Sequence, residues 1–387
     1  MNKDKYNKQR LFNLMVGFFP SILCRFFKLD KDRVIFNSEF NTEFNHNTKY
    51  LFLYFLEEYP QYEIKFVLND SERRKLLTDK YGDHFISSVG LKEILYILKA
   101  KTWITSSLET PTGGIYLNRG RNVFHLGHGA PLKNVGLSEG YGNWKKKIYY
   151  RVLRDNFSYF LSTSEMFSEN WSRCIGTPKH NVIVSGQARS DLILSTSQNG
   201  DKISNSKSVL YAPTWRPFSD TELFPFADKN LRVLNDNLVR LDIVIYLRLH
   251  PNFDSQCLDE YDEFNNIKVL GRDSIDDINE ALGKFDLLIT DYSSIYIDFL
   301  LTKKPVLFLP YDQKQYSEII GFSIDYSENT PGPKPTSQHN FVEELDKLIN
   351  IKSYYALERK KVNDRLNEVQ ENHCKSNAEL ILSFINR

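Results

Sequence analysis

Short apolar runs alternate along the chain with longer segments whose apolar residues recur every three or four positions. A short apolar run bounded by polar residues predicts a buried strand, and the longer periodic segments predict helices. The strands expected in the first half lie at 33–39, 62–69, 102–107, 122–129, 158–164 and 181–186. The helices expected there lie at 47–59, 91–101 and 166–174. This alternation predicts a parallel sheet with crossover helices.

The same alternation restarts after the polar stretch "STSQNGDKISNSKS" at 195–208, whose composition is typical of a linker. Further strands are expected at 209–215, 242–250, 266–270, 286–291 and 305–310, with helices between them and two more helices after Asn340. We therefore predict two doubly wound, Rossmann-like α/β domains that face a cleft, one at 31–194 and one at 209–387. In open α/β sheets ligands bind beyond the C-terminal strand ends, so polar residues there are the candidate site.

Length and composition agree with this division. A chain of 387 residues is long enough for two domains. It is 41% hydrophobic and 26% charged, as globular proteins are, and a net charge of +1 gives no reason to expect nucleic acid as a partner. Four scattered cysteines without a CxxC pair indicate neither a zinc site nor a disulfide framework, and favour a reducing cytoplasm.

The N-terminal stretch at 1–30 is basic and then apolar. Asn13, Pro20 and Arg25 interrupt the apolar run, which is too short to span a membrane, and no signal-peptide cleavage site follows it. We predict an amphipathic segment that lies on an anionic membrane surface. The alternative is a helix that packs on its own domain.

The stretch "FHLGHGAPLK" at 124–133 follows an expected strand. Glycines such as Gly129 let the backbone approach a ligand, and Lys133 adds a cation. The ordinary pKa of histidine suits His128 to taking a proton from an alcohol at neutral pH. The alternative is a hydrogen-bonded loop histidine, and His125 is expected to be structural.

The stretch "YAPTWR" at 211–216 ends another expected strand. Arg216 carries the planar fork that suits phosphate recognition, and Thr214 stands two residues before it. The alternative is a surface arginine stacked on Trp215.

The stretch "LRLHPN" at 247–252 places Arg248 and His250 on one side of a strand by the period-two rule. A histidine at the strand tip can donate to a phosphate oxygen or to a leaving group. The alternative is a histidine that satisfies a loop carbonyl.

The stretch "LLITDYSSIYIDFL" at 287–300 ends an apolar strand at Thr290 and Asp291 and opens a helix at Ser293 and Ser294. Serines cap helices, and a helix N-terminus also binds phosphate through its free N–H groups. Two consecutive serines favour an anion site over capping alone.

Several motifs are absent from the sequence. The phosphate-binding loop GxxxxGK[ST], the dinucleotide motif GxGxxG after the first strand, and the zinc motif HExxH do not occur. We infer that the chain requires no protein-bound metal and no other cofactor, because its cations and helix terminus can stabilise a leaving phosphate.

These motifs, in this order, resemble the CDP-glycerol glycerophosphotransferase family of teichoic acid and capsule biosynthesis. The similarity runs from about residue 33 to residue 310. It implies a GT-B-type fold, CDP-glycerol bound mainly by the second domain, and His128 as the base for an acceptor hydroxyl. It further implies that His250 contacts the diphosphate and assists CMP departure, while Arg216, Ser293 and Ser294 hold phosphates.

The resemblance implies transfer of glycerol phosphate from CDP-glycerol to a hydroxyl of a lipid-linked saccharide or a growing polyol-phosphate polymer. It implies peripheral attachment to the cytoplasmic face of the cell membrane, to which the basic stretch at 143–154 could contribute unless it is an ordinary solvated face. Two departures stand out: Gly127 occupies the place of an aromatic residue, and the chain matches the family's shorter members. The alternatives are a CDP-ribitol enzyme, a GT-B glycosyltransferase that uses a nucleotide sugar, and a non-catalytic polymer-binding protein.

Overall fold

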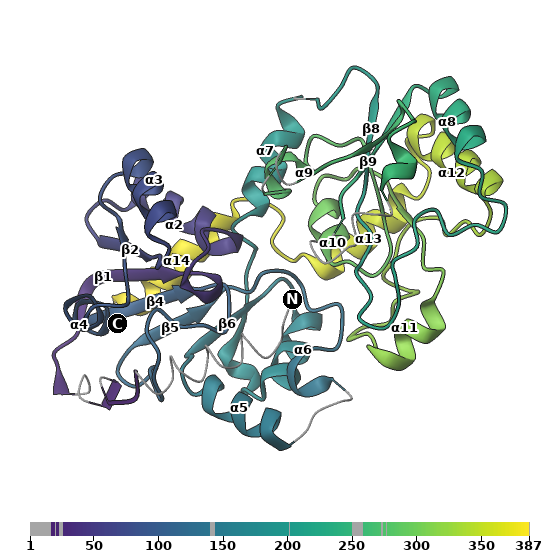
Figure 1. The fold of residues 1–387 in the computed structure, drawn as a ribbon. Coiled ribbons are helices and arrows are strands. Elements are labelled where there is room, and N and C mark those ends of the chain that lie inside the picture. Colours follow the sequence, from purple (N-terminus) through teal and green to yellow (C-terminus); the bar gives the residue numbers. More distant parts are fainter. Residues whose placement is uncertain are drawn as a thin grey trace. The chain divides into compact units, whose positions relative to one another are not determined.

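The structure, a computed structural model, describes residues 17–19, 21–22, 26–139, 144–200, 202–249, 258–271, 274–275 and 277–386. The described chain divides into two compact units, each built around a parallel sheet (Figure 1). The first unit takes in the residues up to Ala130, then Val135–Arg189, and those from Glu371 onward. The second takes in Pro131–Asn134 and Ser190–Gln370.

The sheet of the first unit has seven strands in the order β3-β2-β1-β4-β5-β6-β7. Every neighbouring pair is parallel. The strands are β1 (Asp30–Asn37), β2 (Glu63–Val67), β3 (Phe85–Ile86), β4 (Ala100–Thr105), β5 (Asn122–His125), β6 (Tyr159–Ser162) and β7 (Val182–Val184).

Helices cover both faces of this sheet. They are α2 (His46–Glu58), α3 (Ser71–Tyr81), α4 (Leu91–Leu98), α5 (Trp144–Arg154), α6 (Glu165–Ile175) and α14 (His373–Ile385), with short 3-10 turns η2 (Glu39–Asn41), η3 (Gly136–Ser138) and η4 (Lys179–Asn181). On β1, Val34 and Phe36 join the core that includes α2 and α14, whereas Ile35 joins the core that includes α4 and α6. The pleat sends successive side chains to opposite faces, so a strand covered on both faces is apolar throughout.

The sheet of the second unit has five parallel strands in the order β10-β9-β8-β11-β12. The strands are β8 (Lys207–Tyr211), β9 (Ile243–Leu247), β10 (Ile267–Val269), β11 (Leu287–Thr290) and β12 (Val306–Phe308). The helices are α7 (Ser190–Gln198), α8 (Leu231–Arg240), α9 (Asn279–Leu282), α10 (Ile295–Leu300), α11 (Gln313–Ile319), α12 (Gln338–Asn350) and α13 (Ala356–Leu366), with the 3-10 turn η6 (Asp259–Tyr261).

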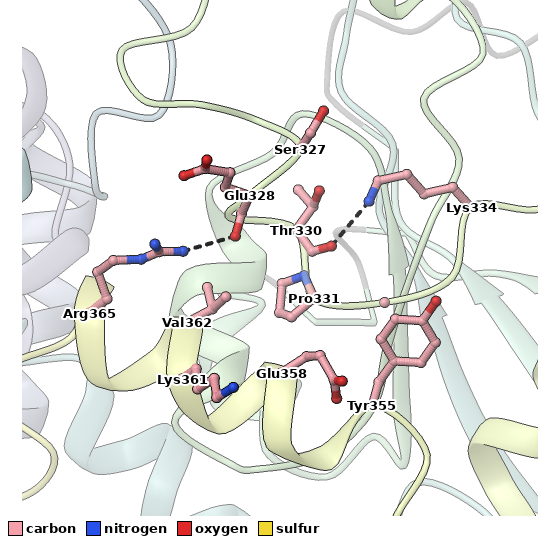
Figure 2. A pocket seen from close by; sticks show the side chains of 11 residues that line it. Ser327, Glu328, Thr330, Pro331, Lys334, Tyr355, Glu358, Lys361, Val362 and Arg365 are labelled. Carbon is pink, nitrogen blue, oxygen red and sulfur yellow. Dashed lines mark hydrogen bonds between the residues drawn. The ribbon is translucent and has the colours of Figure 1, made fainter.

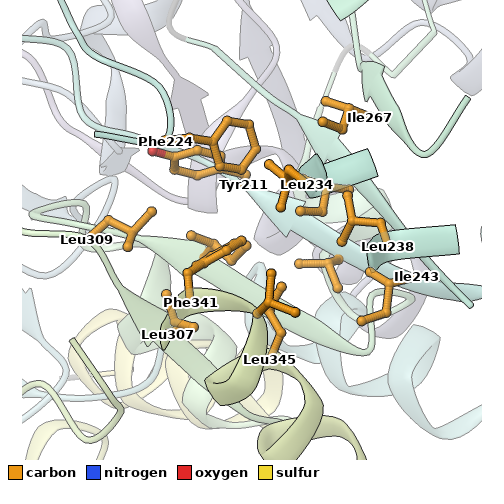
Figure 3. Packing of buried hydrophobic residues seen from close by; sticks show 14 of the residues in the cluster. Tyr211, Phe224, Leu234, Leu238, Ile243, Ile267, Leu307, Leu309, Phe341 and Leu345 are labelled. Atoms are coloured by element: carbon orange, nitrogen blue, oxygen red, sulfur yellow. The ribbon is translucent and has the colours of Figure 1, made fainter. Parts of the chain in front are cut away.

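Helices α8 and α12 pack on one face of the second sheet, as Figure 3 shows. Leu234 and Leu238 of α8 and Phe341 and Leu345 of α12 are fully buried in one cluster with strand residues such as Ile243. The helix ends are set locally, since the Asn230 side chain caps α8 and the Ser337 side chain caps α12.

The strand order reverses direction once in each sheet. In the first sheet the reversal lies between β1 and β4, and in the second it lies between β8 and β11. Loops that leave the C-terminal ends of strands at such a reversal enclose the ligand-binding crevice of open α/β sheets. The predicted strand-end motifs at 211–216 and 287–300 leave the two strands that flank the second reversal.

The structure confirms the two-sheet α/β fold but moves the predicted domain boundaries. Residues 371–387, assigned from the sequence to the second domain, join the first unit, because Ala378, Ile381 and Ile385 of α14 are buried in its core. Helix α7 covers the start of the stretch predicted as a linker at 195–208. Three helices, not two, close the described chain after β12 and α11, namely α12, α13 and α14.

Candidate active site

The loop that follows β5 is organised by the buried His125. The His125 ring lies 5.2–5.5 Å, centroid to centroid, from the rings of Phe157, Phe160 and Trp171, and its Nδ1 accepts a hydrogen bond from the Gly127 N–H at 3.1 Å. Burial, with a smaller effect of His128, lowers the pKa of His125 to about 3. His125 is therefore a neutral structural residue, and Gly127, at φ +71°, turns the chain away from it.

His128 is exposed to solvent, and its ring is held in one orientation. Its Nδ1 lies 3.2 Å from the carbonyl oxygen of Ser106, at the end of β4. A carbonyl only accepts, so Nδ1 carries the proton in the neutral ring and Nε2 is left as the proton acceptor. The Arg189 guanidinium donates to the His128 carbonyl at 2.7 Å, which fixes the backbone.

The first turn of α2 holds this loop in place. The Asn47 side-chain amide donates to the carbonyl oxygens of Leu126 and Gly127, at 3.3 and 2.9 Å, and its oxygen accepts from the Arg189 N–H at 3.3 Å. The Thr48 N–H donates to the Ser106 hydroxyl at 2.9 Å. The loop is thus tied to the strand ends beside the reversal in the first sheet.

Two residues that the sequence does not predict lie beside His128. The His46 ring lies 5.4 Å from the His128 ring, centroid to centroid, and the His46 Nε2 lies 3.6 Å from a carboxylate oxygen of Glu39. Loss of hydration beside the surrounding protein lowers the pKa of His128, and His46 lowers it further. The Ser106 carbonyl and Glu39 raise it. No short motif holds the trio together, because Glu39 and His46 lie between β1 and the start of α2, whereas His128 follows β5.

In the second unit, Arg216 lies at the centre of a buried ion-pair network. Its Nε and Nη2 donate to the two carboxylate oxygens of Asp312 at 3.0 and 2.8 Å, and its Nη1 donates to Asp291 and to the Thr214 carbonyl. Burial by itself would lower the pKa of Arg216, but Asp312 and Asp291 outweigh it and raise the pKa. The guanidinium therefore stays charged, and four of its five N–H groups donate to protein acceptors.

Asp291 and Thr290 tie the two strand-end loops together. The Asp291 carboxylate accepts from the Thr214 N–H at 2.8 Å, and the Thr290 hydroxyl donates to the Ala212 carbonyl at 2.7 Å. Thr290, Asp291 and Arg216 are 0%, 2% and 1% exposed. This geometry argues against a phosphate contact by Arg216 and against the substrate contacts predicted for Thr290 and Asp291, since these groups are enclosed and already bonded.

Lys133 comes from the segment 131–134, which packs with the second unit. The Ser323 N–H donates to the Leu132 carbonyl at 2.9 Å, and the Asn134 N–H donates to the Gly321 carbonyl at 3.2 Å. The Lys133 amine lies 5.8 Å from the centre of the Tyr316 ring, and burial lowers its pKa to about 8. Gly129, at φ +156°, lies just before this segment.

The remaining predicted residues stand at the other strand ends. Ser293 and Ser294 are half-buried, and Ser294 begins α10 without a side-chain capping bond, so capping does not account for its hydroxyl. The Thr214 hydroxyl is buried with no hydrogen-bond partner among the described residues. Arg248 is half-buried and donates to the carbonyls of Leu270 and Gly271. Strand β9 ends at Leu247, earlier than predicted, and His250 lies outside the described residues.

A cavity of about 420 Å³ lies apart from all of these residues, between the segment 327–334 and α13 (Figure 2). Two of the cations that line it donate to the backbone: Arg365 to the Glu328 carbonyl at 2.8 Å and Lys334 to the Thr330 carbonyl at 3.1 Å. We assign no ligand to it.

No cluster of three or more His, Cys, Asp or Glu side chains that could hold a metal ion occurs in the described part of the chain. In the same residues, no helix is both long and apolar enough to cross a membrane. The described strand ends carry an imidazole, hydroxyls and cations, which suit the binding and transfer of an anionic group.

The sequence as a whole decides the family. The family model described as CDP-Glycerol:Poly(glycerophosphate) glycerophosphotransferase matches residues 18–385. The chain belongs to this family. It is thus a CDP-glycerol glycerophosphotransferase, as the order of its motifs predicts.

The glycerophosphotransferase is similar to teichoic acid enzymes of several bacteria. It is 26% identical over 342 residues to the teichoic acid poly(glycerol phosphate) polymerase of Bacillus spizizenii, which covers 82% of this chain and 84% of that protein. It is 25% identical over 354 residues to the teichoic acid glycerol-phosphate transferase of Staphylococcus aureus, covering 84% and 86% of the two chains. The polymerase of Bacillus subtilis is 28% identical over 344 residues, but the match covers only 44% of that longer protein.

Solved structures show the same fold. The wall teichoic acid polymerase TagF superposes with a TM-score of 0.74 at 22% identity, covering 98% of this glycerophosphotransferase and 93% of that chain. A UDP-GlcNAc 2-epimerase from Neisseria meningitidis superposes with a TM-score of 0.52 at 13% identity, covering 92% of this chain and 100% of that one. Both likenesses concern the two-sheet α/β architecture alone.

Proposed function

We propose that this glycerophosphotransferase transfers glycerol phosphate from CDP-glycerol to a hydroxyl of a lipid-linked saccharide or a growing teichoic-acid or capsule-type polymer, with release of CMP. The observation that carries the proposal is the orientation of His128. Its Nδ1 is engaged by the Ser106 carbonyl, so the solvent-exposed ring offers Nε2 as a proton acceptor.

In the proposed reaction, Nε2 of His128 takes the proton of the acceptor hydroxyl. The acceptor oxygen attacks the β-phosphorus of CDP-glycerol, and the bond from that phosphorus to the bridging oxygen breaks. CMP leaves with the electron pair of that bond, and His250 assists by donating to the departing phosphate. Phosphoryl transfer depends mainly on positioning and electrostatic stabilisation, which strand-end residues can supply.

The second unit binds CDP-glycerol in this proposal. Its proposed contacts come from Lys133, Thr214, Arg248, Ser293 and Ser294. The backbone at Gly129, a residue of the first unit, is a further proposed substrate contact. The half-buried serines at the start of α10 support this choice, as does the buried Thr214 hydroxyl, which has no hydrogen-bond partner in the described part of the chain.

Arg216, Thr290 and Asp291 have an indirect role in the revised proposal. They hold the loop at 211–216 against the loop that follows β11, and so place Thr214 and the serines. Their hydrogen bonds to one another's loops and their burial support this assignment.

We place the enzyme on the cytoplasmic face of the cell membrane, as a peripheral protein. Trp144 and Ile148 of α5 are 67% and 54% exposed, and the exposed basic residues Lys147 and Arg151 lie on the same helix. Exposed aromatic and basic side chains on one helix suit an anionic lipid surface. Phe19 and Phe26 of the predicted segment 1–30 are 72% and 84% exposed, whereas much of that segment lies outside the described residues.

The donor decides between the proposal and its rivals. A CDP-ribitol donor is the nearest alternative, because relatives at 23% and 24% identity are named ribitol-phosphate polymerases. The test is to incubate the protein and an acceptor with CDP-glycerol, CDP-ribitol or UDP-sugars, and to measure released nucleotide and the mass of the product. CMP released only from CDP-glycerol supports the proposal. UDP release, or no release from any donor, contradicts it.

A further inference from the structure

Three side chains from two connections meet beside the strand reversal of the first sheet. Glu39 lies in η2 after β1, His46 begins α2, and His128 follows β5. The rings of His46 and His128 are 5.4 Å apart, and the carboxylate of Glu39 lies 3.6 Å from Nε2 of His46.

The loop that carries Glu39 and His46 is held in an uncommon backbone conformation. Phe40, Asn41 and His46 have φ values of 53°, 58° and 56°, a region that costs energy for residues other than glycine. Hydrogen bonds maintain it, because the Asn41 amide donates to the carbonyls of Thr110 and Pro111. The backbone is therefore strained in the segment 40–46, which places the His46 ring beside the His128 ring.

Several groups near His128 influence whether its ring carries a proton. His46 and Arg189 disfavour a proton on the His128 ring, whereas Glu39 and the Ser106 carbonyl favour one. His125 also lies nearby but is buried and neutral. The carboxylate of Glu39 lies within ion-pair distance of the His46 ring, 3.6 Å from Nε2.

We propose that Glu39 and His46 form a positioning pair that keeps His128 in its neutral, proton-accepting form. This inference rests on the proposed function, in which His128 is the base. The carboxylate of Glu39 stabilises a positive charge on His46. That charge opposes the uptake of a solvent proton by His128 before the acceptor arrives. His46 acts through His128 and does not itself touch the substrate.

The test is a titration of histidine ring signals by NMR in ¹³C,¹⁵N-histidine-labelled protein, with His128 assigned by His128→Asn. The variant His46→Phe keeps a ring but removes the charge, and should raise the pKa of His128 by roughly 0.5 to 1 unit. The variant His46→Arg restores a permanent charge and should return the His128 pKa to the wild-type value or below it. A merely structural role would not produce opposite responses to Phe and Arg.

His180→Phe and His180→Arg are the matched controls, since His180 is an exposed histidine of the same unit and should leave the His128 titration unchanged. The acidic limb of the pH profile of kcat/KM should move in the same direction as the His128 pKa in each variant. An His128 pKa that is the same in wild type, His46→Phe and His46→Arg overturns the inference. If the pKa shifts occur but wild-type protein releases no CMP from CDP-glycerol, the positioning pair stands and the proposed function fails.

Discussion

His128 in the first unit and Arg216 in the second both follow a strand near the reversal of a parallel sheet, but their side chains are used differently. His128 is exposed and keeps one ring nitrogen as an acceptor. Arg216 is buried, and two carboxylates and a carbonyl accept from its guanidinium. The difference shows that a polar residue at a strand end can either stay accessible to a substrate or hold neighbouring loops together. Its other partners decide which.

The largest expected effect is on the reaction. His128→Ala removes the proposed base, and should lower the rate of CMP release from CDP-glycerol by roughly 10²- to 10⁴-fold. CDP-glycerol binding, measured by calorimetry, should be nearly unchanged. His180→Ala is the control, and wild-type turnover in His128→Ala would remove His128 from the mechanism.

Removing a carboxylate from the buried ion-pair network of Arg216, Asp291 and Asp312 should lower the stability of the protein. Asp312→Ala leaves the buried guanidinium of Arg216 with one carboxylate, and should lower the free energy of unfolding by about 3–5 kcal/mol. Denaturant unfolding followed by circular dichroism measures the loss. Asp364→Ala breaks the exposed pair with Lys360 and should have little effect. Equal losses in the two variants would contradict the scaffold assignment.

Lys133 should make CDP-glycerol binding depend on pH, because the pKa of its amine is about 8 in the free protein. Above that pH the amine is neutral, so an anionic donor binds only if the protein takes up a proton. The dissociation constant for CDP-glycerol should therefore rise above pH 8, by up to roughly tenfold per pH unit. Lys133→Met should remove this slope, and Lys334→Met, which changes a lysine at the separate cavity, should retain it. An unchanged slope in Lys133→Met would exclude Lys133 from donor binding.

The smallest effect is expected at the helix starts. Ser294 makes no side-chain capping bond, so Ser294→Ala should leave stability nearly unchanged while weakening CDP-glycerol binding several-fold. Ser337 caps α12 through the Asn340 N–H, so Ser337→Ala should cost about 1 kcal/mol of stability and leave binding unchanged. Thermal unfolding and calorimetry distinguish these patterns, and a stability loss in Ser294→Ala alone would mark it as a cap.

The sequence predicted most elements and the positions of the candidate residues along them. Apolar runs marked the strands. The motifs at 124–133, 211–216 and 287–300 contain the last residues of β5, β8 and β11, respectively, and the loops that follow them. The sequence analysis assigned α14 to the second domain, and this was wrong, because an apolar pattern marks a buried face without saying which core buries it. Arg216, predicted from the sequence to bind phosphate, is enclosed by Asp291 and Asp312, and these partners are not visible in its own motif.

Local periodicity and turn chemistry by themselves determined the strands, the helices and the order of the motifs, because those properties depend on neighbours a few residues away. The order of strands in each sheet was decided only by tertiary structure, and with it the contacts that distinguish His128 from Arg216. Arg216 meets Asp291 and Asp312 across 75 and 96 residues of chain, and His46 meets His128 from another strand end. Such encounters depend on how whole elements pack, which no short stretch of sequence encodes.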